Sequence, residues 1–340
     1  MKMTRRQFAL SVAAASTLRS SLFAEPLSPI GVPRGVVPGR VTWARDPAAV
    51  TWDGTGSWWA DANNNQAAID RMVSRSIRGL TNQKSDAQAW SAIFHYFNRT
   101  HGRGNTGYKA GEKIAIKANL NNTTDHGTID RLNSSPHVLL SLVRQLTGPG
   151  KVPQLSITVF DSSRFIPGNL YDKIHGEFPG VVFVDHIGGD GRLKAEFKPN
   201  AIPYSITSRN ATGLDTTVTE AAYLIDAALL KGHVSSGVTL CAKNLFGATS
   251  INPDWHKNAH DGFPHNRDGS ASYAAIVDFL GHKDLGEKAM LFLIDGLYGN
   301  ENADPPPSHK WKMAPSMMLG RAAFLCRLTA WPAIQWDSIF

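Results

Sequence analysis

The 340-residue sequence predicts an α/β fold with a mainly parallel central sheet flanked by helices. From Lys113 onward, short apolar runs alternate with amphipathic helical patterns, which is the element order of a parallel sheet with crossover helices. The run 289–294 is apolar throughout, as in a strand buried on both faces. The N-terminal segment differs from the region after Lys113. Four prolines between residues 26 and 38 forbid a continuous helix there. We therefore expect a Pro/Trp-rich N-terminal arm in front of the α/β domain.

The first 24 residues resemble a twin-arginine export signal. The stretch Thr4-Arg5-Arg6-Gln7-Phe8 precedes a weakly hydrophobic, alanine-rich segment, and cleavage after Ala24 fits the small residue there. The apolar part is too short to span a bilayer, so we expect no stable membrane span after cleavage. The predicted partner is the twin-arginine translocase, and the predicted location is periplasmic or otherwise exported.

Charge and cysteine content narrow the classes of function. The formal charge is +7, and removal of the four basic residues in 1–24 lowers it to +3, which is too mild to predict nucleic-acid binding. Only two cysteines occur, Cys241 and Cys326, so we expect no iron–sulfur cluster. Two buried free thiols are favoured over a disulfide between them.

Residues 25–108 are expected to form the arm and two helices, over 66–80 and 86–99, and 109–340 the α/β domain. The arm contains Trp43, Trp52, Trp58 and Trp59. Indoles of this kind either stack on a ligand or pack on the protein core, and packing is the favoured interpretation. Apolar residues recur at helical spacing in both helices, which indicates core-facing sides.

The first strands of the domain end in polar residues. A strand is predicted over 113–117. Lys117 at its end, Asn119 and Asn121 alternate along the chain, so their side chains point to one face if the strand continues. A helix begins with Ser135 as N-cap and proline at its first position. The strand 155–160 ends in Asp161 and Ser162, a pattern of either a ligand site or a turn. Another strand spans 181–184, and 192–216 suggests a short hairpin.

The stretch 223–247 is read as one strand-to-helix unit. An apolar run over 223–230 is followed by Lys231 and His233, a small-residue turn, and a helical pattern over 238–246. Ser235 or Ser236 is expected to cap that helix and to leave backbone N–H groups for an anion. In open α/β sheets ligands bind at the carboxyl ends of strands, so this unit predicts a site there. Its polar members are Lys231, His233, Lys243 and Asn244.

The same stretch, LKGHVSSGVTLCAKNLFG, resembles the signature of the family called domain of unknown function 362. The matching positions are Lys231, His233, Thr239, Lys243, Asn244 and Gly247. The segments IKANLN (116–121) and FDSSR (160–164) resemble two further family motifs, and the resemblance extends over about 109–299. It implies an α/β fold and an acid at Asp295, after the strand 289–294. The family has no established general activity, so the resemblance implies no reaction.

The C-terminal region departs from the family pattern. Trp331 stands where relatives have an aspartate, and the sequence stops at Phe340. The chain is therefore expected to be either naturally short or truncated.

Residues 249–269 are rich in histidine and aspartate, and a divalent metal is one possibility for them. Its ligands would be Asp254, His256 and His260. A surface loop without metal is the favoured alternative.

Three functions remain open from the sequence. The first is an exported enzyme that binds a small anionic ligand, with His233 moving protons and Asp161 or Asp295 as base or metal ligand. The second is a non-catalytic periplasmic binding or scaffold protein, and the third is a divalent-metal-dependent hydrolase. Whether the chain is an enzyme is not decided by the sequence. The expected ligand-binding residues are Lys117, Asn119, Asn121, Ser162, Lys231, Lys243 and Asn244.

Overall fold

The computed structural model describes residues 32–121, 125–128, 130–205, 211–233, 237–250, 275–300 and 316–320. Contacts divide the chain into the units 1–33 and 34–340, and all that follows concerns the second unit.

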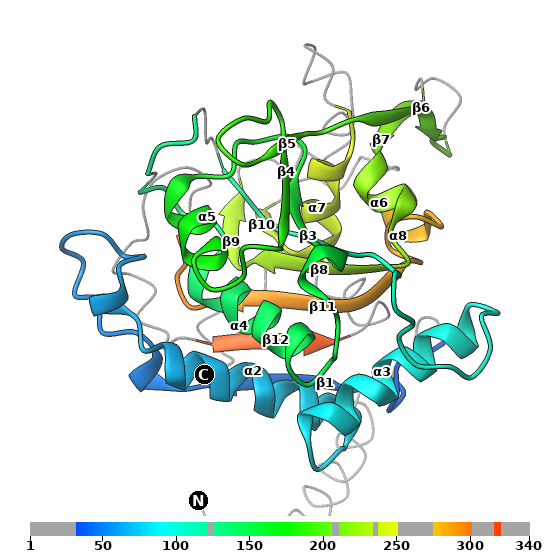
Figure 1. The fold of residues 1–340 in the computed structure, drawn as a ribbon, viewed down its shortest axis with the longest axis horizontal. Coiled ribbons are helices and arrows are strands. Elements are labelled where there is room, and N and C mark those ends of the chain that lie inside the picture. Colours follow the sequence, from blue (N-terminus) through cyan, green and yellow to red (C-terminus); the bar gives the residue numbers. More distant parts are fainter. Residues whose placement is uncertain are drawn as a thin grey trace, which may run out of the picture. The chain divides into compact units, whose positions relative to one another are not determined.

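An eight-stranded sheet forms the centre of this unit (Figure 1). Six neighbouring strands are parallel, which confirms the predicted fold class. Strand β12 runs antiparallel to both β11 and β1, so two strands extend the parallel sheet beyond β11. In order across the sheet the strands are β1 (Val41–Arg45), β12 (Ser316–Gly320), β11 (Ala289–Gly296), β8 (Tyr223–Leu229), β2 (Ile114–Lys117), β3 (Ile157–Asp161), β4 (Val182–Asp185) and β5 (Leu193–Lys194).

Helices cover both faces of the sheet (Figure 1). One face packs on α2 (Gln66–Thr81), α3 (Asp86–Thr100), α4 (Pro136–Thr147) and α5 (Gly168–His175). The other packs on α6 (Thr216–Glu220), α7 (Cys241–Asn244) and α8 (Ala275–Gly281). Short 3₁₀ turns lie at Pro47–Ala49, Asp61–Asn63, Gln154–Ser156 and Leu245–Ala248. Residues of one strand alternate between the two layers, as the pleat requires: Ile114 and Ile116 belong to the first and Ala115 to the second.

The two N-terminal helices follow the predicted pattern closely. Asn65 and Ser85 cap α2 and α3, each accepting a hydrogen bond from a backbone N–H three residues later. Asn82 closes α2 in the left-handed conformation that asparagine tolerates. The apolar faces of both helices are buried, as their spacing indicated.

The arm residues that belong to the second unit pack on its core. Trp58 is 1% exposed and contacts Tyr298 edge-on, whereas Trp43 is 54% exposed. For Trp58 the packing interpretation is therefore right. Residues 41–45 were expected only as arm, yet they form the edge strand β1.

Two small antiparallel pairs lie outside the main sheet. Strands β6 (Phe197–Ile202) and β7 (Thr212–Asp215) form the hairpin expected in 192–216. The pair β9 (Lys231–His233) and β10 (Gly237–Thr239) was not expected. It replaces the first part of the helix predicted over 238–246, because α7 begins only at Cys241, and the 3₁₀ turn 245–248 follows. The N-cap of α7 is Leu240, so the prediction that Ser235 or Ser236 caps this helix is wrong.

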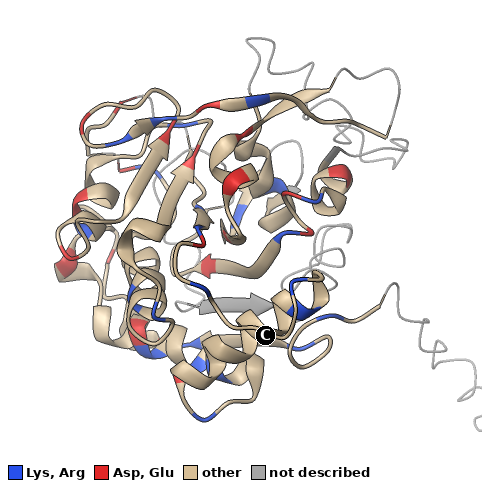
Figure 2. Ribbon diagram, turned by 45° about the vertical axis from the view of Figure 1, so that its right-hand side comes forward, with Lys and Arg blue, Asp and Glu red and all other residues tan. Residues whose placement is uncertain are grey.

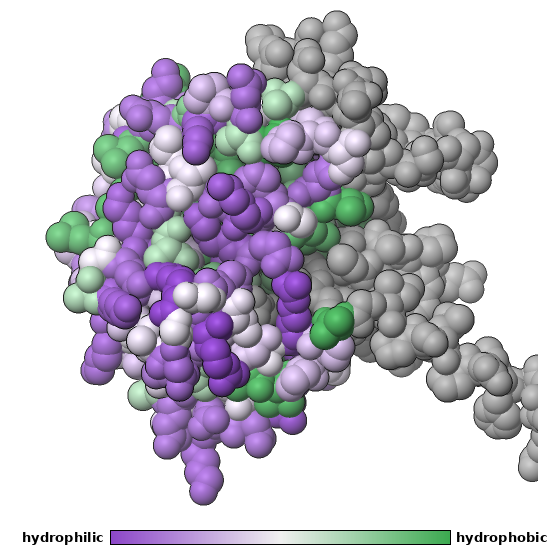
Figure 3. Space-filling model, turned by 90° about the vertical axis from the view of Figure 1, so that its right-hand side faces the viewer, coloured by the Kyte–Doolittle hydropathy of each residue, from purple (hydrophilic) through white to green (hydrophobic). Residues whose placement is uncertain are grey.

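The face in Figure 3 is mainly hydrophilic, and its hydrophobic side chains are scattered among the residues coloured there. Within the described ranges, no helix has both the length and the apolar character that a bilayer crossing needs.

Candidate functional site

A buried ion pair lies at the carboxyl ends of two adjacent strands. Lys117 is the last residue of β2 and Asp161 the last of β3, and Lys117 Nζ lies 2.9 Å from Asp161 Oδ2. Both side chains are at most 2% exposed. Lys117 Nζ also donates to the carbonyl of Ala118, and Asp161 accepts hydrogen bonds from the backbone N–H groups of Leu120 and Ser163. These extra hydrogen bonds satisfy the charges that burial would otherwise leave unpaired.

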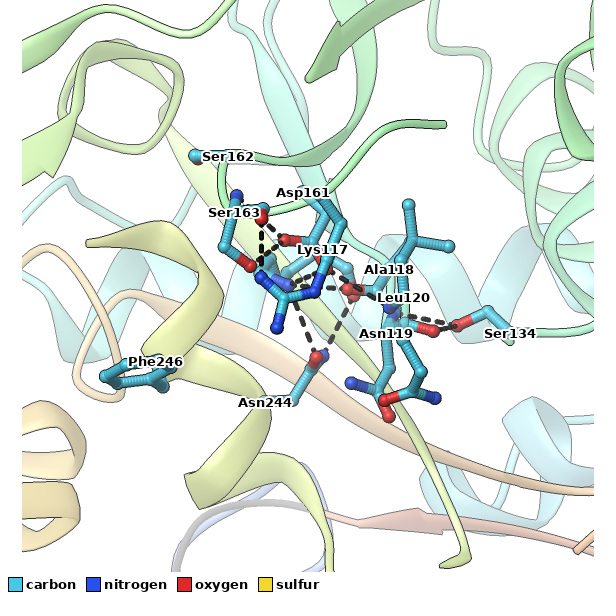
Figure 4. A network of polar contacts seen from close by, with 12 residues as sticks. Lys117, Ala118, Asn119, Leu120, Ser134, Asp161, Ser162, Ser163, Asn244 and Phe246 are labelled. Carbon is cyan, nitrogen blue, oxygen red and sulfur yellow. Dashed lines mark hydrogen bonds and ion pairs between the residues drawn. The ribbon is translucent and has the colours of Figure 1, made fainter. Parts of the chain in front are cut away.

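Asn244 ties this ion pair to the helix layer (Figure 4). Its side-chain oxygen accepts from Lys117 Nζ at 3.3 Å, while its Nδ2 donates to the Lys117 carbonyl at 3.2 Å. The same Nδ2 donates to Asp226 Oδ1 at 2.7 Å. Asn244 is the last residue of α7, so the four-residue helix is fixed to the sheet by its amide group.

Asp226, an acidic residue, lies in the middle of β8, a strand that is buried throughout. It pairs in register with Lys117 across β8 and β2, which puts both side chains on the same face. Its Oδ2 has no hydrogen-bond partner among the described residues. Burial raises the pKa of Asp226 to about 7, against the opposing effects of Asn244 and Lys117. The carboxyl group is thus protonated at acid pH and about half protonated near pH 7.

Gly247 permits the close approach of α7 and the following turn to the ion pair. A Cβ at this position would lie 2.7 Å from Lys117 Nζ and 2.8 Å from Asp161 Oδ1. The Gly247 carbonyl accepts from the N–H of Ser162 at 3.0 Å. Two residues of the sequence KNLFG therefore contribute to the same buried network. Asn244 makes hydrogen bonds to it, and Gly247 leaves the space that it occupies.

Basic residues near this network affect one another's charge state. Burial, followed by the positive charges of Lys231, Arg164 and Lys117, lowers the pKa of Lys243 to about 7, and Asp161 opposes the shift. Lys231 is 2% exposed and lies on β9, directly after β8, whereas Arg164 follows β3. Both basic and acidic positions occur at the ends of the central strands in Figure 2. The site thus combines a neutralised ion pair with an adjacent group of cations.

His233 is close enough to the same lysines to be affected by their charges. Burial and the charges of Lys243 and Lys231 lower the pKa of His233 to about 3. The imidazole is therefore neutral near pH 7, with one ring nitrogen able to accept a hydrogen bond.

Asp295 lies at a strand end, as the resemblance implied, but its carboxylate binds the start of a helix. Its Oδ2 accepts from the N–H of Ser135 at 2.8 Å, and its Oδ1 accepts from the N–H of Leu297 at 3.0 Å. Ser135 is the N-cap of α4 and makes no side-chain capping bond itself. Asp295 thus supplies the capping carboxylate, on the sheet face opposite Lys117 and Asp226. Burial raises its pKa to about 6.

The strand β2 ends at Lys117, so the condition for Asn119 and Asn121 to share its face is not met. Instead both shape the loop after β2: Asn119 N–H donates to Ser134 Oγ, and Asn121 N–H donates to Asn133 Oδ1. Ser162 Oγ donates to Asp215, which caps α6. Their predicted roles in ligand binding remain predictions.

No group of three or more histidine, cysteine, aspartate or glutamate side chains within the described ranges is arranged to hold a metal ion. The predicted metal ligands Asp254, His256 and His260 lie outside those ranges, as does Cys326. Cys241 is buried with a free thiol.

Two residues of this network were not selected from the sequence. Asp226 was included in an apolar run, although an acid inside a buried parallel strand is rare enough to be a signal by itself. Arg164 was quoted only as part of FDSSR, and its place beside Lys243 depends on packing between distant segments.

The comparisons with known proteins identify a family and include a distant structural likeness. The structure of the lactate racemase apoprotein from Thermoanaerobacterium thermosaccharolyticum is similar with 12% identity and a TM-score of 0.35. The alignment covers 67% of this chain and 48% of that one, so the chain spans about half of that protein, and we base no functional argument on it. No curated protein matches the sequence. The profile of the family described as domain of unknown function (DUF362) matches residues 114–323, which is more than half of the chain. The chain therefore belongs to the family called domain of unknown function 362.

Proposed function

We propose that the protein is an exported enzyme that binds a small anionic ligand at the carboxyl ends of β2, β3 and β8. The observation that carries the proposal is that the positive charges of Lys231 and Arg164 act on Lys243 next to the buried Lys117–Asp161 ion pair. Phosphate and carboxylate groups are the ligands that such cations favour. The charge of Asp161 opposes the effect of these cations on Lys243, and Asp161 is itself paired with Lys117.

His233 is the group that would move protons if the protein is an enzyme. Besides burial, the charges of Lys243 and Lys231 lower its pKa, and a bound anion would offset those charges and raise the pKa toward neutral, where an imidazole can exchange a proton with the ligand. Asp161 would hold Lys117 and the adjacent backbone in place, because its oxygens already accept several hydrogen bonds. A non-catalytic binding protein would use the same cations and show no turnover.

Ligand binding is tested by calorimetric titration of the exported protein with inorganic phosphate and with malonate. We expect saturable binding that weakens about 10- to 100-fold in Lys231→Met and in Lys243→Met, since a hydrogen bond to a charged group contributes about 1.5–3 kcal/mol. Lys109→Met is the control, because Lys109 is exposed. Absence of binding by both anions, or an equal loss in the control, would overturn the proposal.

Two further experiments test a metal-dependent function and the predicted export. Each titration is repeated with magnesium or manganese and with a chelator, and a requirement for metal would favour the hydrolase that Asp254, His256 and His260 suggested. Export is tested by cell fractionation of the Arg5→Lys, Arg6→Lys double variant, which we expect to remain in the cytoplasm.

A further inference from the structure

We propose that His126 is a proton-dependent clasp, which ties segment 125–128 to the turn after β4 only while a proton lies between its ring and Asp190. His126 belongs to the connection between β2 and α4, and its ring meets a carboxylate on each side. Nε2 lies 2.8 Å from Asp185 Oδ2, and Nδ1 lies 2.9 Å from Asp190 Oδ2. The inference goes beyond the proposed function and does not depend on it.

Asp185, the last residue of β4, fixes the role of one ring nitrogen. Its Oδ1 accepts from the N–H groups of Ile187 and Gly188, and its Oδ2 accepts from the N–H of Ile166 at 3.0 Å. With three backbone N–H groups already directed at its oxygens, the buried Asp185 side chain acts as an acceptor. The His126 ring must therefore donate to it from Nε2.

The contact with Asp190 then requires a second proton. A neutral imidazole has one N–H and one lone pair, whereas an imidazolium has two N–H groups. With the N–H on Nε2, a neutral ring would direct its Nδ1 lone pair at an ionised Asp190, and the two groups would repel each other. The contact at 2.9 Å is a hydrogen bond only when a proton lies between Nδ1 and Asp190. The Asp190 side chain is 76% exposed, so this proton can exchange with solvent.

The clasp holds two pieces of backbone that have other contacts to lose. The N–H of Gly168, the first residue of α5, donates to the carbonyls of His126 at 2.9 Å and Gly127 at 3.0 Å. Asp190 stands in the turn 188–191, in which all four residues have a positive φ. The other three are glycines, so this turn gains much freedom when a contact is lost. Loss of the proton should therefore free Asp190 and weaken the attachment of segment 125–128 to α5.

The charges around the ring favour the extra proton. A carboxylate lies on each side of it, and opposite charges at such distances stabilise the protonated ring. Arg192 donates to the carbonyls of Asp190 and Ile166, and its guanidinium lies 3.9 Å from the centre of the Tyr171 ring. The ionisable side chains of the elements that pack around the clasp are Asp125, Arg164, Tyr171, Asp172, Asp185, His186, Asp190, Arg192 and Lys194.

The test is hydrogen exchange of the exported protein at about pH 5.5 and about pH 8, since histidine ordinarily changes its charge in this range. The protection factor of the Gly168 amide, corrected for the intrinsic effect of pH, is measured relative to the amides of α3, which report opening of the whole protein. We expect this ratio to fall about tenfold or more at the higher pH, because a hydrogen bond to a charged group shifts an opening equilibrium about 10- to 100-fold. An unchanged ratio would overturn the clasp.

Asp190→Asn separates the proton from the contact. Asparagine tolerates the left-handed backbone, and its amide can accept from a protonated Nδ1 or donate to a neutral one. Gly168 should therefore stay protected at both pH values. Asp190→Gly keeps the backbone and removes the contact, so protection should be low at both. Glu196→Gln, at an exposed position, is the control and should follow wild type. A fall in Asp190→Asn as large as in wild type would contradict the inference.

Nitrogen-15 NMR of the histidine rings gives an independent measurement, with His126→Ala to assign the signals. We expect two N–H groups on the His126 ring at the lower pH and one, on Nε2, at the higher pH. A neutral His126 ring at the lower pH, in protein whose Gly168 amide is protected, would show that the clasp closes without the extra proton and would overturn the inference.

Discussion

Gly247 lies where any side chain would strike the buried ion pair. Its missing Cβ leaves room for Lys117 Nζ and Asp161 Oδ1, each less than 3 Å from where that atom would stand. We expect Gly247→Ala to lower the free energy of unfolding by about 1–3 kcal/mol, because overpacking forces both groups off their contacts. Urea denaturation measures the loss. The matched control is Gly281→Ala, since a Cβ at Gly281 meets nothing within 4 Å. Similar losses in both variants would contradict the argument.

Single residues also show where sequence reasoning succeeds and where it stops. Lys117, Asp161 and Asn244 were expected at one site because each follows or faces a strand end, and they are in direct contact. Asp226 was missed because its importance depends on which residue of the neighbouring strand it meets. The register between β2 and β8 joins segments that lie more than 100 residues apart, and no local pattern encodes it.

At the scale of elements, Asp295 links strand β11 to helix α4. Asp295→Ala should lower the free energy of unfolding by about 0.5–2 kcal/mol, the usual cost of losing an N-cap acceptor. Phosphate affinity should change less than about twofold, because its carboxylate faces α4 and not the Lys117 side of the sheet. Thermal denaturation and calorimetry on the same variant measure the two effects. A large loss of phosphate affinity without loss of stability would instead favour the catalytic role first predicted for Asp295.

The same residue explains one limit of strand-end reasoning. Asp295 does follow a buried strand, but the pleat directs it to the same side as Leu291 and Leu293, which pack in the layer of α2 to α5. The hairpin of β9 and β10 shows a second limit. Glycine and serine between 232 and 237 signal a turn, yet the turn that joins a strand to a helix has a similar composition.

For the whole molecule, the alternation of strands and helices was sufficient to predict the mainly parallel sheet and its flanking helices. The extension by β12 and β1 was not predictable in this way. These strands come from opposite ends of the chain and pair with each other antiparallel. No short turn joins them in the sequence, so no local pattern predicts that they pair. Long-range pairing of this kind depends on the completed sheet rather than on local periodicity.

The free energy of unfolding of the whole molecule should depend on pH through the titration of Asp226. Its pKa rises from 3.8 to about 7 on folding, so between these values the folded protein holds a proton that the unfolded chain releases. The contribution of Asp226 to the free energy of unfolding is therefore greatest below about pH 4 and decreases as pH rises toward 7. Asp226→Asn keeps the acceptor for Asn244 and has no proton to lose, which removes this decrease.

Urea denaturation of wild type and Asp226→Asn at several pH values tests this sign. The stability of the variant relative to wild type should rise between pH 4 and 7, by at most about 1.4 kcal/mol per pH unit. Asp172→Asn, at an exposed position, should stay parallel to wild type. A variant that loses stability relative to wild type as pH rises would mean that Asp226 is ionised in the folded protein. The network would then have to be rewritten as two carboxylates, Asp161 and Asp226, sharing the one ammonium group of Lys117.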